Sequence, residues 1–337
     1  MSTQKITSME VAKLAGVSQS AVSRVFTPGA SSSKKTNELV RKAAAELGYR
    51  PNVLARSLIT GKSRMIGLVV AYLDNYFYPE ALELLSSALQ KKGYHVLIFM
   101  SGNKEGDIAD AVDEILDYQV DGIIAASVSM SSDLAKRCTS AGVPVVLFNR
   151  TQDDDRLSAV TSDNFQGGQK VARFLLAGGH KRIGYIAGWE GASTQRDREK
   201  GFTEELVRNG QELYAREVGN FNSDEARQAA RTMFSKQNFP DAVFVANDAM
   251  AIAVIDVIRF ELGLQVPEQV SVVGYDDVPI SSWPAYDLTT VRQPANRMVA
   301  ETVSILIESI ENKTTTARRV EIDGPQMVRG SAKISDK

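Results

Sequence analysis

A short stretch near the start of the chain, QSAVSRVF at residues 19–26, carries polar side chains of the kinds that read nucleic-acid bases. Helical spacing puts its apolar residues on one face and four short or forked polar residues on the other: Gln19, Ser20, Ser23 and Arg24. The major groove of DNA is about 12 Å wide and admits a helix whose bulky residues point away from the bases. The stretch therefore predicts a recognition helix, in which Gln19 and Ser20 set base preference and Arg24 contacts a guanine.

The residues before this stretch supply the signals that would position it. Thr7 and Glu10 have the spacing of a capping box, and Gly16 is a natural end for the helix that the box begins. Ser18 then caps the second helix, whose buried stripe is formed by Val22, Val25 and Phe26. The pattern predicts two helices joined by a tight turn. We also count the two cap residues, Thr7 and Ser18, among the DNA-binding residues.

A third helix is expected over residues 36–47, ending at Gly48, with an apolar stripe of Leu39, Val40, Ala43, Ala44 and Leu47. Three such helices also occur in ordinary bundles that bind no DNA. The charge distribution favours DNA binding: residues 1–62 carry ten Lys or Arg and three Asp or Glu, net +7, whereas residues 63–337 carry 29 and 38, net -9. A basic head on an acidic body indicates that the head alone meets a polyanion.

The composition is ordinary for a globular protein, and we expect the protein to be cytoplasmic. A chain of 337 residues predicts two or three domains, and 43% hydrophobic with 24% charged residues is ordinary for such domains. Cys138 is the single cysteine, so no internal disulfide is possible. The N-terminus lacks a signal-peptide pattern and no apolar run reaches membrane-spanning length, so we expect no membrane partner.

From residue 64 onward, short β-branched runs alternate with helical stretches. The expected strands are MIGLVVA, HVLIFMS, GIIAAS, VPVVLFN, RIGYIAG, AVFVAN, VSVVGYD, TTVRQ and RRVEI. Apolar strands separated by amphipathic helices are typical of parallel βαβ units. The pattern runs twice and breaks near Thr161, which predicts two doubly wound lobes.

The segments VAKLAGVSQSAVSRVF and LGYRPNVLARSLITGKS resemble the head and hinge of the lactose-repressor (LacI/GalR) family of bacterial transcription regulators. In that family a Pro-Asn-x-x-Ala-x-x-Leu segment becomes a short helix on operator DNA and pairs with its twin across a dimer. The matching residues are Pro51, Asn52, Ala55 and Leu58. So short a helix is marginal alone, and in a minor groove Leu58 would act as an apolar wedge. The alternative is a plain linker with an incidental leucine.

The resemblance covers essentially the whole chain and implies an α/β fold. We expect a three-helix helix-turn-helix head, a hinge helix, and a two-lobed periplasmic-binding-protein-like body of two doubly wound parallel sheets. It also implies that the chain returns to the first lobe after about Thr290 and ends in the second. The expected parts are the head (1–50), the hinge (51–62), the N-terminal lobe (63–161 plus 291–320) and the C-terminal lobe (162–290 plus 321–337).

Ligands of doubly wound sheets bind outside the carboxyl ends of the strands. There the first lobe offers Asp74, Phe77, Tyr78, Ser127 and Arg150, with Asn75, Tyr76 and Asn149 beside them. The second lobe offers Arg198, Phe221, Asn247, Asp276 and Trp283, with Asp248 adjacent. Aromatic faces, carboxylates and forked donors suit a polyhydroxylated ligand, so we expect a sugar or sugar derivative. The resemblance implies that Arg198 and Asp276 are the most recurrent contacts.

Other polar residues are expected to be structural. Asp163 and Asn164 would cap a helix, and His180 in a helix-to-strand turn would make a structural hydrogen bond. Asp276 and Asp277 are adjacent, so only one is expected to face the cleft. Two histidines and one cysteine far apart argue against a metal site, and no phosphate loop, Gly-x-Ser-x-Gly elbow or Cys/His pair is present. We therefore expect no cofactor and no enzyme activity.

The sequence thus predicts a transcription regulator, most simply a repressor, whose affinity for operator DNA is controlled by a small carbohydrate effector. A homodimer on a pseudo-palindromic operator is expected, because two heads would read two half-sites. The alternatives are a solute-binding protein of a transport system and an α/β enzyme. Whether the effector induces or corepresses stays open, as does dimer against tetramer.

Overall fold

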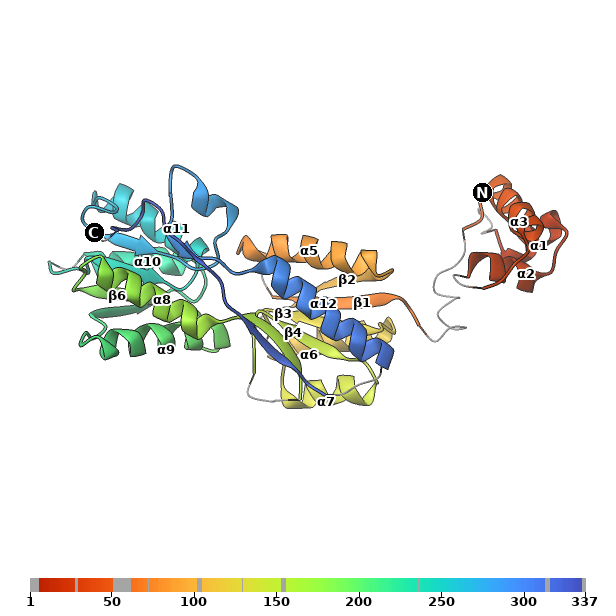
Figure 1. Ribbon diagram of the computed structural model, residues 1–337, viewed down its shortest axis with the longest axis horizontal. Helices are drawn as coiled ribbons and strands as arrows, with labels where there is room; N and C mark the ends of the chain where they lie inside the picture. The colour runs from red at the N-terminus through yellow and green to blue at the C-terminus, as the bar shows by residue number, and fades with distance from the viewer. Residues whose placement is uncertain are drawn as a thin grey trace. The chain divides into compact units, whose positions relative to one another are not determined.

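The computed structural model describes residues 6–27, 30–50, 62–71, 73–101, 105–128, 130–152, 156–235, 237–312 and 316–334. The chain divides into two compact units, Met1–Ser63 and Arg64–Lys337, referred to below as the head and the body. The predicted hinge helix, with Asn52, Ala55 and Leu58, lies outside the described residues. The body consists of two lobes of parallel sheet flanked by helices (Figure 1), which confirms the predicted fold class.

The described residues of the head form three helices around a small apolar core: α1 (Ser8–Ala15), α2 (Gln19–Phe26) and α3 (Lys34–Leu47). The capping box forms as predicted: the Glu10 amide donates to Thr7 Oγ1 at 3.4 Å and the Thr7 amide donates to Glu10 Oε2 at 2.7 Å. Gly16 ends α1 in the left-handed region at φ 64°. α3 begins two residues earlier than expected because Ser33 caps it, and Leu39 is 42% exposed instead of buried.

The first lobe contains a six-stranded parallel sheet in the order β11-β5-β4-β3-β1-β2. Its strands are β1 (Met65–Val70), β2 (His95–Met100), β3 (Gly122–Ala126), β4 (Val145–Phe148), β5 (Ser158–Ser162) and β11 (Arg319–Ile322). Two separate apolar clusters cover its faces. One involves α5 (Phe77–Lys91) and α12 (Ala295–Asn312); the other involves α6 (Glu105–Asp117) and α7 (Ser132–Ser140).

The second lobe contains a four-stranded parallel sheet in the order β7-β6-β8-β9. Its strands are β6 (Ile183–Ala187), β7 (Ala215–Val218), β8 (Ala242–Val245) and β9 (Ser271–Val273). Its helices are α8 (Asn164–Ala177), α9 (Ser193–Arg208), α10 (Ser223–Phe234) and α11 (Asp248–Asp256), followed by a π-helical turn η1 (Val257–Glu261) and a 3-10 turn η2 (Pro279–Ser282). A two-stranded ribbon pairs β10 (Thr290–Val291) with β12 (Gln326–Met327).

The chain crosses between the lobes three times: after β5, between β10 and α12, and between β11 and β12. α12 packs on the first lobe, and β11 pairs with β5, so the chain does return to the first sheet after residue 290. β11 extends to Ile322, two residues beyond the boundary expected at 320. β5, β7 and β12 were not expected as strands, because they are short and rich in polar residues.

Two glycines bring α8 and α9 into close contact, and this contact positions a site residue. A Cβ atom on Gly168 would lie 2.2 Å from the Arg198 carbonyl oxygen, and one on Gly201 would lie 2.0 Å from the Phe165 carbonyl oxygen. No side chain fits at either position. The close crossing places Arg198 of α9 beside Asn164, the first residue of α8.

Candidate functional site

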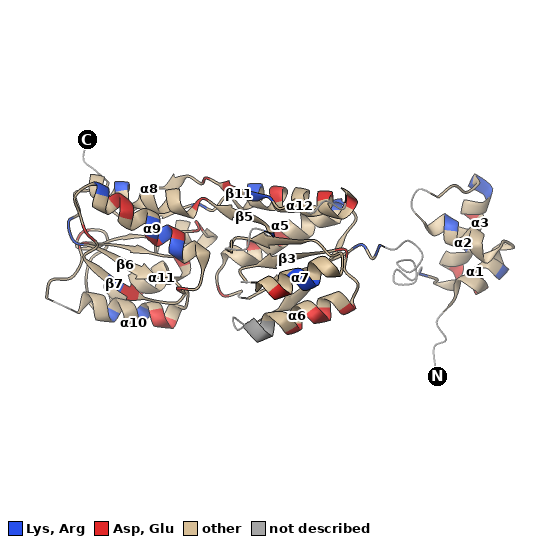
Figure 2. Ribbon diagram, turned by 90° about the horizontal axis from the view of Figure 1, so that it is seen from below, with Lys and Arg blue, Asp and Glu red and all other residues tan. Residues whose placement is uncertain are grey.

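The solvent-facing side of α2 carries the side chains expected to contact DNA bases. Gln19, Ser20, Ser23 and Arg24 are all exposed, whereas Val22 and Val25 are buried in the head core. The side-chain hydrogen bonds of Gln19 and Arg24 are short-range: Gln19 Nε2 donates to Ser8 Oγ at 3.0 Å, and Arg24 Nε donates to the Ser20 carbonyl at 3.4 Å. These side chains are thus accessible to an external partner. Lys and Arg occur on α1, α2 and α3 (Figure 2).

The two cap residues have structural duties within the head. Thr7 Oγ1 donates to Glu10 Oε2 at 2.9 Å, and Ser18 Oγ accepts from the Ala21 amide at 3.2 Å. Arg24 lines a hollow of about 400 Å³ together with Ala21, Ser31, Ser32, Ser33 and Thr36. This hollow lies at the first turn of α3, which carries Lys34 and Lys35 and no acidic residue. Hydroxyls, lysines and a helix N-terminus favour contact with DNA phosphate.

A cavity of about 760 Å³ opens between the two lobes of the body. Eight of the residues expected to bind an effector line it: Asp74, Tyr78, Ser127, Arg150, Arg198, Phe221, Asn247 and Asp276. They follow β1, β3 and β4 in the first lobe and β7, β8 and β9 in the second, or lie on α5 and α9. The structure therefore brings the carboxyl ends of both sheets together at one cleft, as the doubly wound topology requires.

Two expected effector residues do not line this cavity. Phe77 is 2% exposed and stacks on Phe148 with ring centroids 6.2 Å apart, so its ring belongs to the core beneath the cleft. Trp283 follows η2 and is 54% exposed on the surface. The sequence placed Trp283 near a strand end but did not show that η2 carries its ring away from the cavity.

Backbone in the left-handed region is concentrated at this cleft. Among non-glycine residues, Ser127 (φ 62°), Asn149 (φ 64°), Asn220 (φ 52°), Phe221 (φ 59°) and Asp276 (φ 130°) all have positive φ. All five line the cavity. Such conformations cost free energy for L-residues and persist where the surrounding structure imposes them, most often at functional sites. Asp276 therefore faces the cleft through an unusual backbone angle and not through strand alternation, while Asp277 pairs with Arg292 and Arg329.

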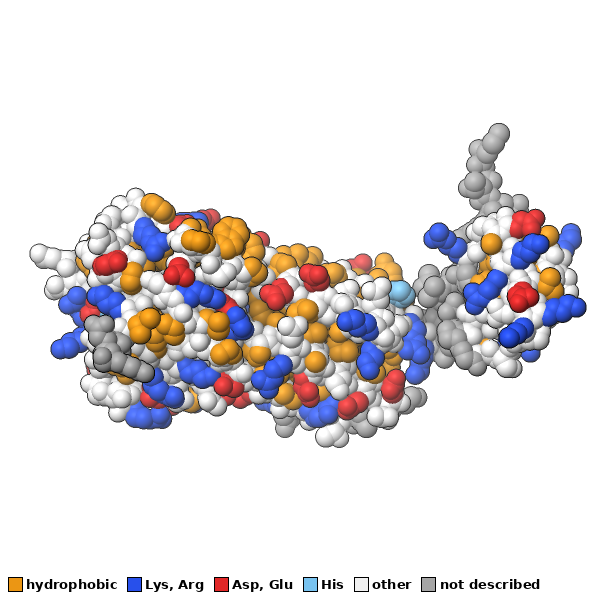
Figure 3. Space-filling view, turned by 45° about the horizontal axis from the view of Figure 1, so that its top comes forward, with side chains coloured by type: hydrophobic (Ala, Val, Ile, Leu, Met, Phe, Trp, Pro, Cys, Tyr) orange, Lys and Arg blue, Asp and Glu red, His pale blue; other side chains and the backbone are white. Residues whose placement is uncertain are grey.

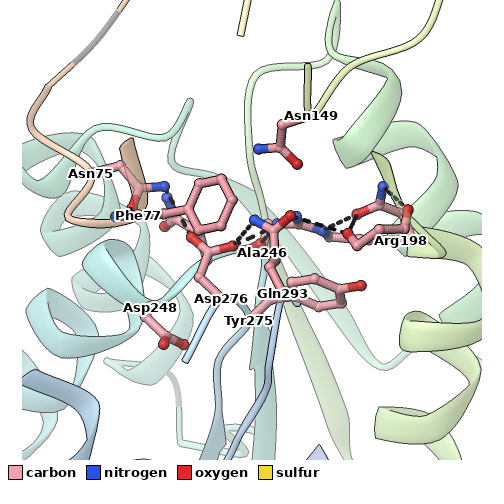
Figure 4. Close-up of polar contacts among 12 residues, drawn as sticks. Asn75, Phe77, Asn149, Arg198, Ala246, Asp248, Tyr275, Asp276 and Gln293 are labelled. Carbon is pink, nitrogen blue, oxygen red and sulfur yellow. Dashed lines mark hydrogen bonds and ion pairs between the residues drawn. The ribbon is translucent and has the colours of Figure 1, made fainter. Parts of the chain in front are cut away.

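Arg198 and Asp276 form the charged centre of the cleft (Figure 4). Both are almost fully buried, and Arg198 Nη2 lies 3.6 Å from Asp276 Oδ1. Arg198 Nε donates to Asn164 Oδ1 at 2.8 Å, Nη1 donates to the Ala246 carbonyl at 2.5 Å, and the guanidinium lies 3.7 Å from the centre of the Tyr275 ring. The guanidinium is held from several sides, so its position does not depend on a ligand.

A second buried carboxylate, Asp248, lies next to this centre at the start of α11 (Figure 4). It accepts hydrogen bonds from Thr290 Oγ1 at 2.6 Å, Ser281 Oγ at 2.7 Å and the Val278 amide at 3.0 Å. Burial, reinforced by the charge of Asp276, raises the pKa of Asp248 to about 7. Burial also raises the pKa of Asp276, against the opposing effect of Arg198. The two carboxylates therefore titrate as a pair.

Two buried amide atoms of the cavity lining have no hydrogen-bond partner among the described residues: Asn149 Oδ1 and Asn247 Nδ2. Asn149 Nδ2 donates to Tyr78 Oη at 2.9 Å, and Asn247 Oδ1 accepts from the Met250 amide at 3.0 Å as the cap of α11. The Met250 amide can only donate, so it fixes the orientation of the Asn247 amide. In the orientation that Asn149 adopts, its nitrogen faces Tyr78 and its oxygen is left for a ligand. A buried polar atom without a partner is costly, so the cavity offers one acceptor and one donor to a ligand.

The sequence did not indicate several other lining residues. They are Trp189, Thr194, Asn220, the segment 222–225, Ala249 and Gln293. Trp189 follows β6, and its ring lies 5.3 Å from the Arg150 guanidinium of the other lobe. Its position directly after the RIGYIAG strand was a usable signal. Gln293 ends the expected strand TTVRQ, so its position was a usable signal as well, although β10 itself covers only Thr290–Val291.

The residues expected to be structural behave differently from one another. Asp163 caps α8 as predicted, by accepting from the Gln166 amide at 2.9 Å. Asn164 is not a cap; it is buried and holds Arg198. His180 is buried with Nδ1 3.3 Å from Asp241 Oδ1, consistent with a structural role.

Within the described ranges, no cluster of three or more His, Cys, Asp or Glu side chains is placed to hold a metal ion. Of the helices in the part of the chain that the structure describes, none is both long enough and apolar enough to cross a bilayer.

Comparison with known proteins identifies both parts of the chain. Residues 7–52 match the family described as "Bacterial regulatory proteins, lacI family", and residues 172–332 match the "Periplasmic binding protein-like domain". The HTH-type transcriptional repressor PurR of Pasteurella multocida (strain Pm70) is 30% identical over 329 residues, 96% of this chain and 98% of the relative. The HTH-type transcriptional regulator CelR of Thermobifida fusca is 32% identical over 330 residues, 95% of this chain and 96% of the relative.

Solved structures agree with the sequence comparisons. The Lac repressor dimer bound to operator and the anti-inducer ONPF matches with a TM-score of 0.88 at 27% identity, covering 97% of this chain and 99% of that one. The CelR–cellobiose complex matches with a TM-score of 0.73 at 31% identity, covering 97% and 100%. The chain therefore belongs to the lacI family of bacterial regulatory proteins.

Proposed function

We propose that this protein is a transcriptional repressor that binds a pseudo-palindromic operator through α2 and releases or tightens it when a small carbohydrate binds between the lobes. One observation carries the proposal: a single chain combines an exposed face of α2 with a buried, preorganised polar cleft. Family membership supports both halves, and no described feature favours a solute-binding protein without DNA binding. An operator-binding regulator works on chromosomal DNA, hence in the cytoplasm.

A carbohydrate fits the cleft's chemistry. Trp189 and Phe221 offer flat faces for the apolar C–H surfaces of a sugar ring, while Asp276, Asn149 and Asn247 offer acceptors and a donor for hydroxyl groups. The cavity of about 760 Å³ is large enough for more than one sugar ring. The relative CelR, solved with cellobiose, makes that disaccharide the natural first probe.

A homodimer is the proposed assembly, because an operator with two half-sites is read by two heads related by two-fold symmetry. Figure 3 shows a face of the body on which hydrophobic and charged side chains are interspersed. β2 is an edge strand of the first sheet, and its Ile98 and Met100 are 53% and 54% exposed. Half-exposed apolar side chains on a sheet edge favour a contact with a second copy.

The experiment that tests the function starts from DNA. The full chain selects duplexes from a random pool, and fluorescence anisotropy then measures its affinity for the selected sequence with and without added sugars. We expect a pseudo-palindrome, and an affinity that changes at least tenfold with one of the sugars. Selection of no common sequence would contradict operator binding. A selected operator whose affinity no sugar, polyol, nucleoside or small acid changes would contradict effector control.

The assembly has its own test. Sedimentation of the full chain is expected to show a dimer, and Ile98→Lys with Met100→Lys is expected to yield monomers that bind the operator more weakly. A dimer that persists in the double variant would place the interface elsewhere.

A further inference from the structure

One hydrogen bond joins the two lobes directly at the charged centre of the cleft. Asn75 Nδ2, in the loop between β1 and α5, donates to Asp276 Oδ2 at 2.9 Å (Figure 4). The two residues are 201 positions apart in the chain and belong to different lobes. The carboxylate that is expected to hold an effector is therefore already bonded to the first lobe by the protein itself.

The orientation of the Asn75 amide is fixed by its own loop. The Phe77 amide donates to Asn75 Oδ1 at 3.0 Å at the start of α5. Oδ1 must therefore face the backbone, which leaves Nδ2 facing Asp276. An ionised carboxylate only accepts hydrogen bonds, so the donor end of the amide is the end that the contact needs.

Asp276 is held equally firmly on its own side. Gln293 Nε2 donates to Asp276 Oδ1 at 2.6 Å, and Gln293 Oε1 lies 3.1 Å from Ser162 Oγ, with which it shares a hydrogen bond. Gln293 and Ser162 both lie at crossovers between the lobes. The lobes must move about the three crossovers. Asp276 is connected through Gln293 and Ser162 to two of them, so a displacement of Asp276 by the first lobe also displaces those two crossovers.

We propose that Asn75 is an interlobe latch, which stabilises the closed arrangement of the body by bonding the effector-binding carboxylate. The proposal rests on the proposed function in one respect, namely that the effector uses the same carboxylate and so acts on the same open–closed equilibrium. A hydrogen bond to a charged group shifts such an equilibrium by roughly 10- to 100-fold. The latch thereby sets how far the body is closed before any effector is added.

The latch is not the sole link between the lobes. The Thr151 amide donates to Ser193 Oγ at 2.9 Å, and the Arg150 guanidinium lies over Trp189. These contacts come from the loop after β4 and do not involve Asp276. Loss of the Asn75 contact alone is therefore expected to shift the equilibrium and not to separate the lobes completely.

Asn75→Asp is the sharpest variant, because it keeps the acceptor for the Phe77 amide and replaces the donor with an oxygen that repels Asp276. Asn75→Ala removes the bond without adding repulsion. Asn209→Asp is the matched control: Asn209 Nδ2 also donates to a carboxylate, Glu205 Oε1 at 3.3 Å, but both residues belong to α9 and its end, within one lobe.

Pulsed electron paramagnetic resonance on the full chain measures the interlobe distance without operator or effector. Spin labels are placed at Asp133→Cys on α7 and Val207→Cys on α9, where the replaced side chains are 88% and 65% exposed. The native Cys138 is buried and is not expected to be labelled. We expect the longest or broadest distance distribution in Asn75→Asp, an intermediate one in Asn75→Ala and the shortest in the unsubstituted chain. Asn209→Asp is expected to give the same distribution as the unsubstituted chain.

A distribution that is the same in Asn75→Asp, Asn75→Ala and the unsubstituted chain would overturn the latch. Opening in Asn209→Asp to the same extent would also overturn it, because the effect would then follow from the added charge. Operator affinity measured on the same variants is a separate readout. Failure of the chain to bind any operator would contradict the proposed function while leaving the distance result to decide the latch.

Discussion

The head and the cleft both depend on polar side chains, but they hold those side chains in opposite ways. In the head, Gln19 and Arg24 are exposed, and their hydrogen bonds span at most 11 positions of the chain. In the cleft, Arg198 and Asp276 are 2% and 3% exposed, and their hydrogen bonds reach residues up to 201 positions away. The contacts of the head are local and leave its polar side chains to an external partner, whereas the charged centre of the cleft is held by contacts from distant parts of the chain before a ligand binds.

This difference predicts how substitutions will behave. Exposed side chains on α2 act nearly independently, so each is expected to affect recognition of DNA with little effect on folding. Buried side chains in the cleft share partners, so each is expected to affect stability and binding together, in a non-additive way.

The largest expected effect is that of Arg198→Ala on the stability of the body. The substitution leaves Asp276 without its cation and the Asn164 and Ala246 oxygens without a donor. Removing one partner of a buried ion pair costs about 3–5 kcal/mol. Urea unfolding followed by tryptophan fluorescence measures this cost in the body alone, because both tryptophans, Trp189 and Trp283, belong to it.

Arg196→Ala is the control for that measurement. Arg196 lies on the same helix, but its side chain is 54% exposed and pairs with its neighbour Asp197. Its loss is expected to change the free energy of unfolding by no more than about 0.5 kcal/mol. Equal effects of the two substitutions would show that the buried contacts of Arg198 do not hold the cleft together.

The next largest effect concerns pH. Burial raises the pKa of Asp248 from 3.8 to about 7 in the folded protein, so the folded state binds a proton that the unfolded state has released between those values. The stability contributed by this group is fully present below pH 4 and is lost as the pH rises through about 7. The slope approaches about 1.4 kcal/mol per pH unit between the two pKa values.

Asp248→Asn isolates that contribution. The amide does not titrate, so the free energy of unfolding is expected to fall less steeply between pH 5 and pH 7 than in the unsubstituted chain. Urea unfolding at several pH values gives the comparison. Parallel curves for the two proteins would mean that Asp248 stays ionised in the folded state.

The sequence foretold the head well because its signals are local. The capping box, the glycine that ends α1 and the stripe of α2 each lie within a few residues of the feature that they specify. The carboxyl ends of apolar strands likewise indicated most of the cleft, since in parallel sheets those ends are at the same edge. The strand β7 of the second lobe (Ala215–Val218) was missed, because Arg216 and Glu217 interrupt any apolar run.

The partnerships of the cleft were beyond prediction from sequence. Asn164 looked like a helix cap because it follows Asp163 at a helix start, yet it binds the guanidinium of a residue 34 positions away. Trp283 looked like an effector contact because it is aromatic and follows a strand end, yet η2 directs it to the surface. Both outcomes depend on how helices and turns pack in three dimensions, which no local pattern encodes.

A smaller effect, and one confined to recognition, is expected for Arg24→Ala. Arg24 is exposed on α2, and loss of a bidentate contact with guanine costs about 1–3 kcal/mol of discrimination. Fluorescence anisotropy with the selected operator and with single-base variants is expected to show weaker binding and a relaxed preference at one position per half-site.

Lys13→Ala is the comparison. Lys13 is an exposed residue of α1, and its loss is expected to weaken binding to all sequences alike. A loss of affinity for Arg24→Ala that is equal for every base would reassign Arg24 to a phosphate.

The smallest expected effect tests whether the contacts of the head act only within the head. Thr7→Ala removes both side-chain bonds that Thr7 makes with Glu10, and loss of a helix N-cap costs about 1 kcal/mol. Amide hydrogen exchange of α1 is expected to quicken by roughly fivefold in consequence, while the urea transition of the body, reported by tryptophan fluorescence, stays unchanged.

Ser23→Ala is the control. Ser23 is exposed inside α2 and caps no helix, and alanine is a better helix former than serine, so neither α2 nor the exchange in α1 is expected to be weakened by this substitution. A shift of the body's urea transition in Thr7→Ala would show that the two units do not fold independently. The contacts of the head would then affect more than the head itself.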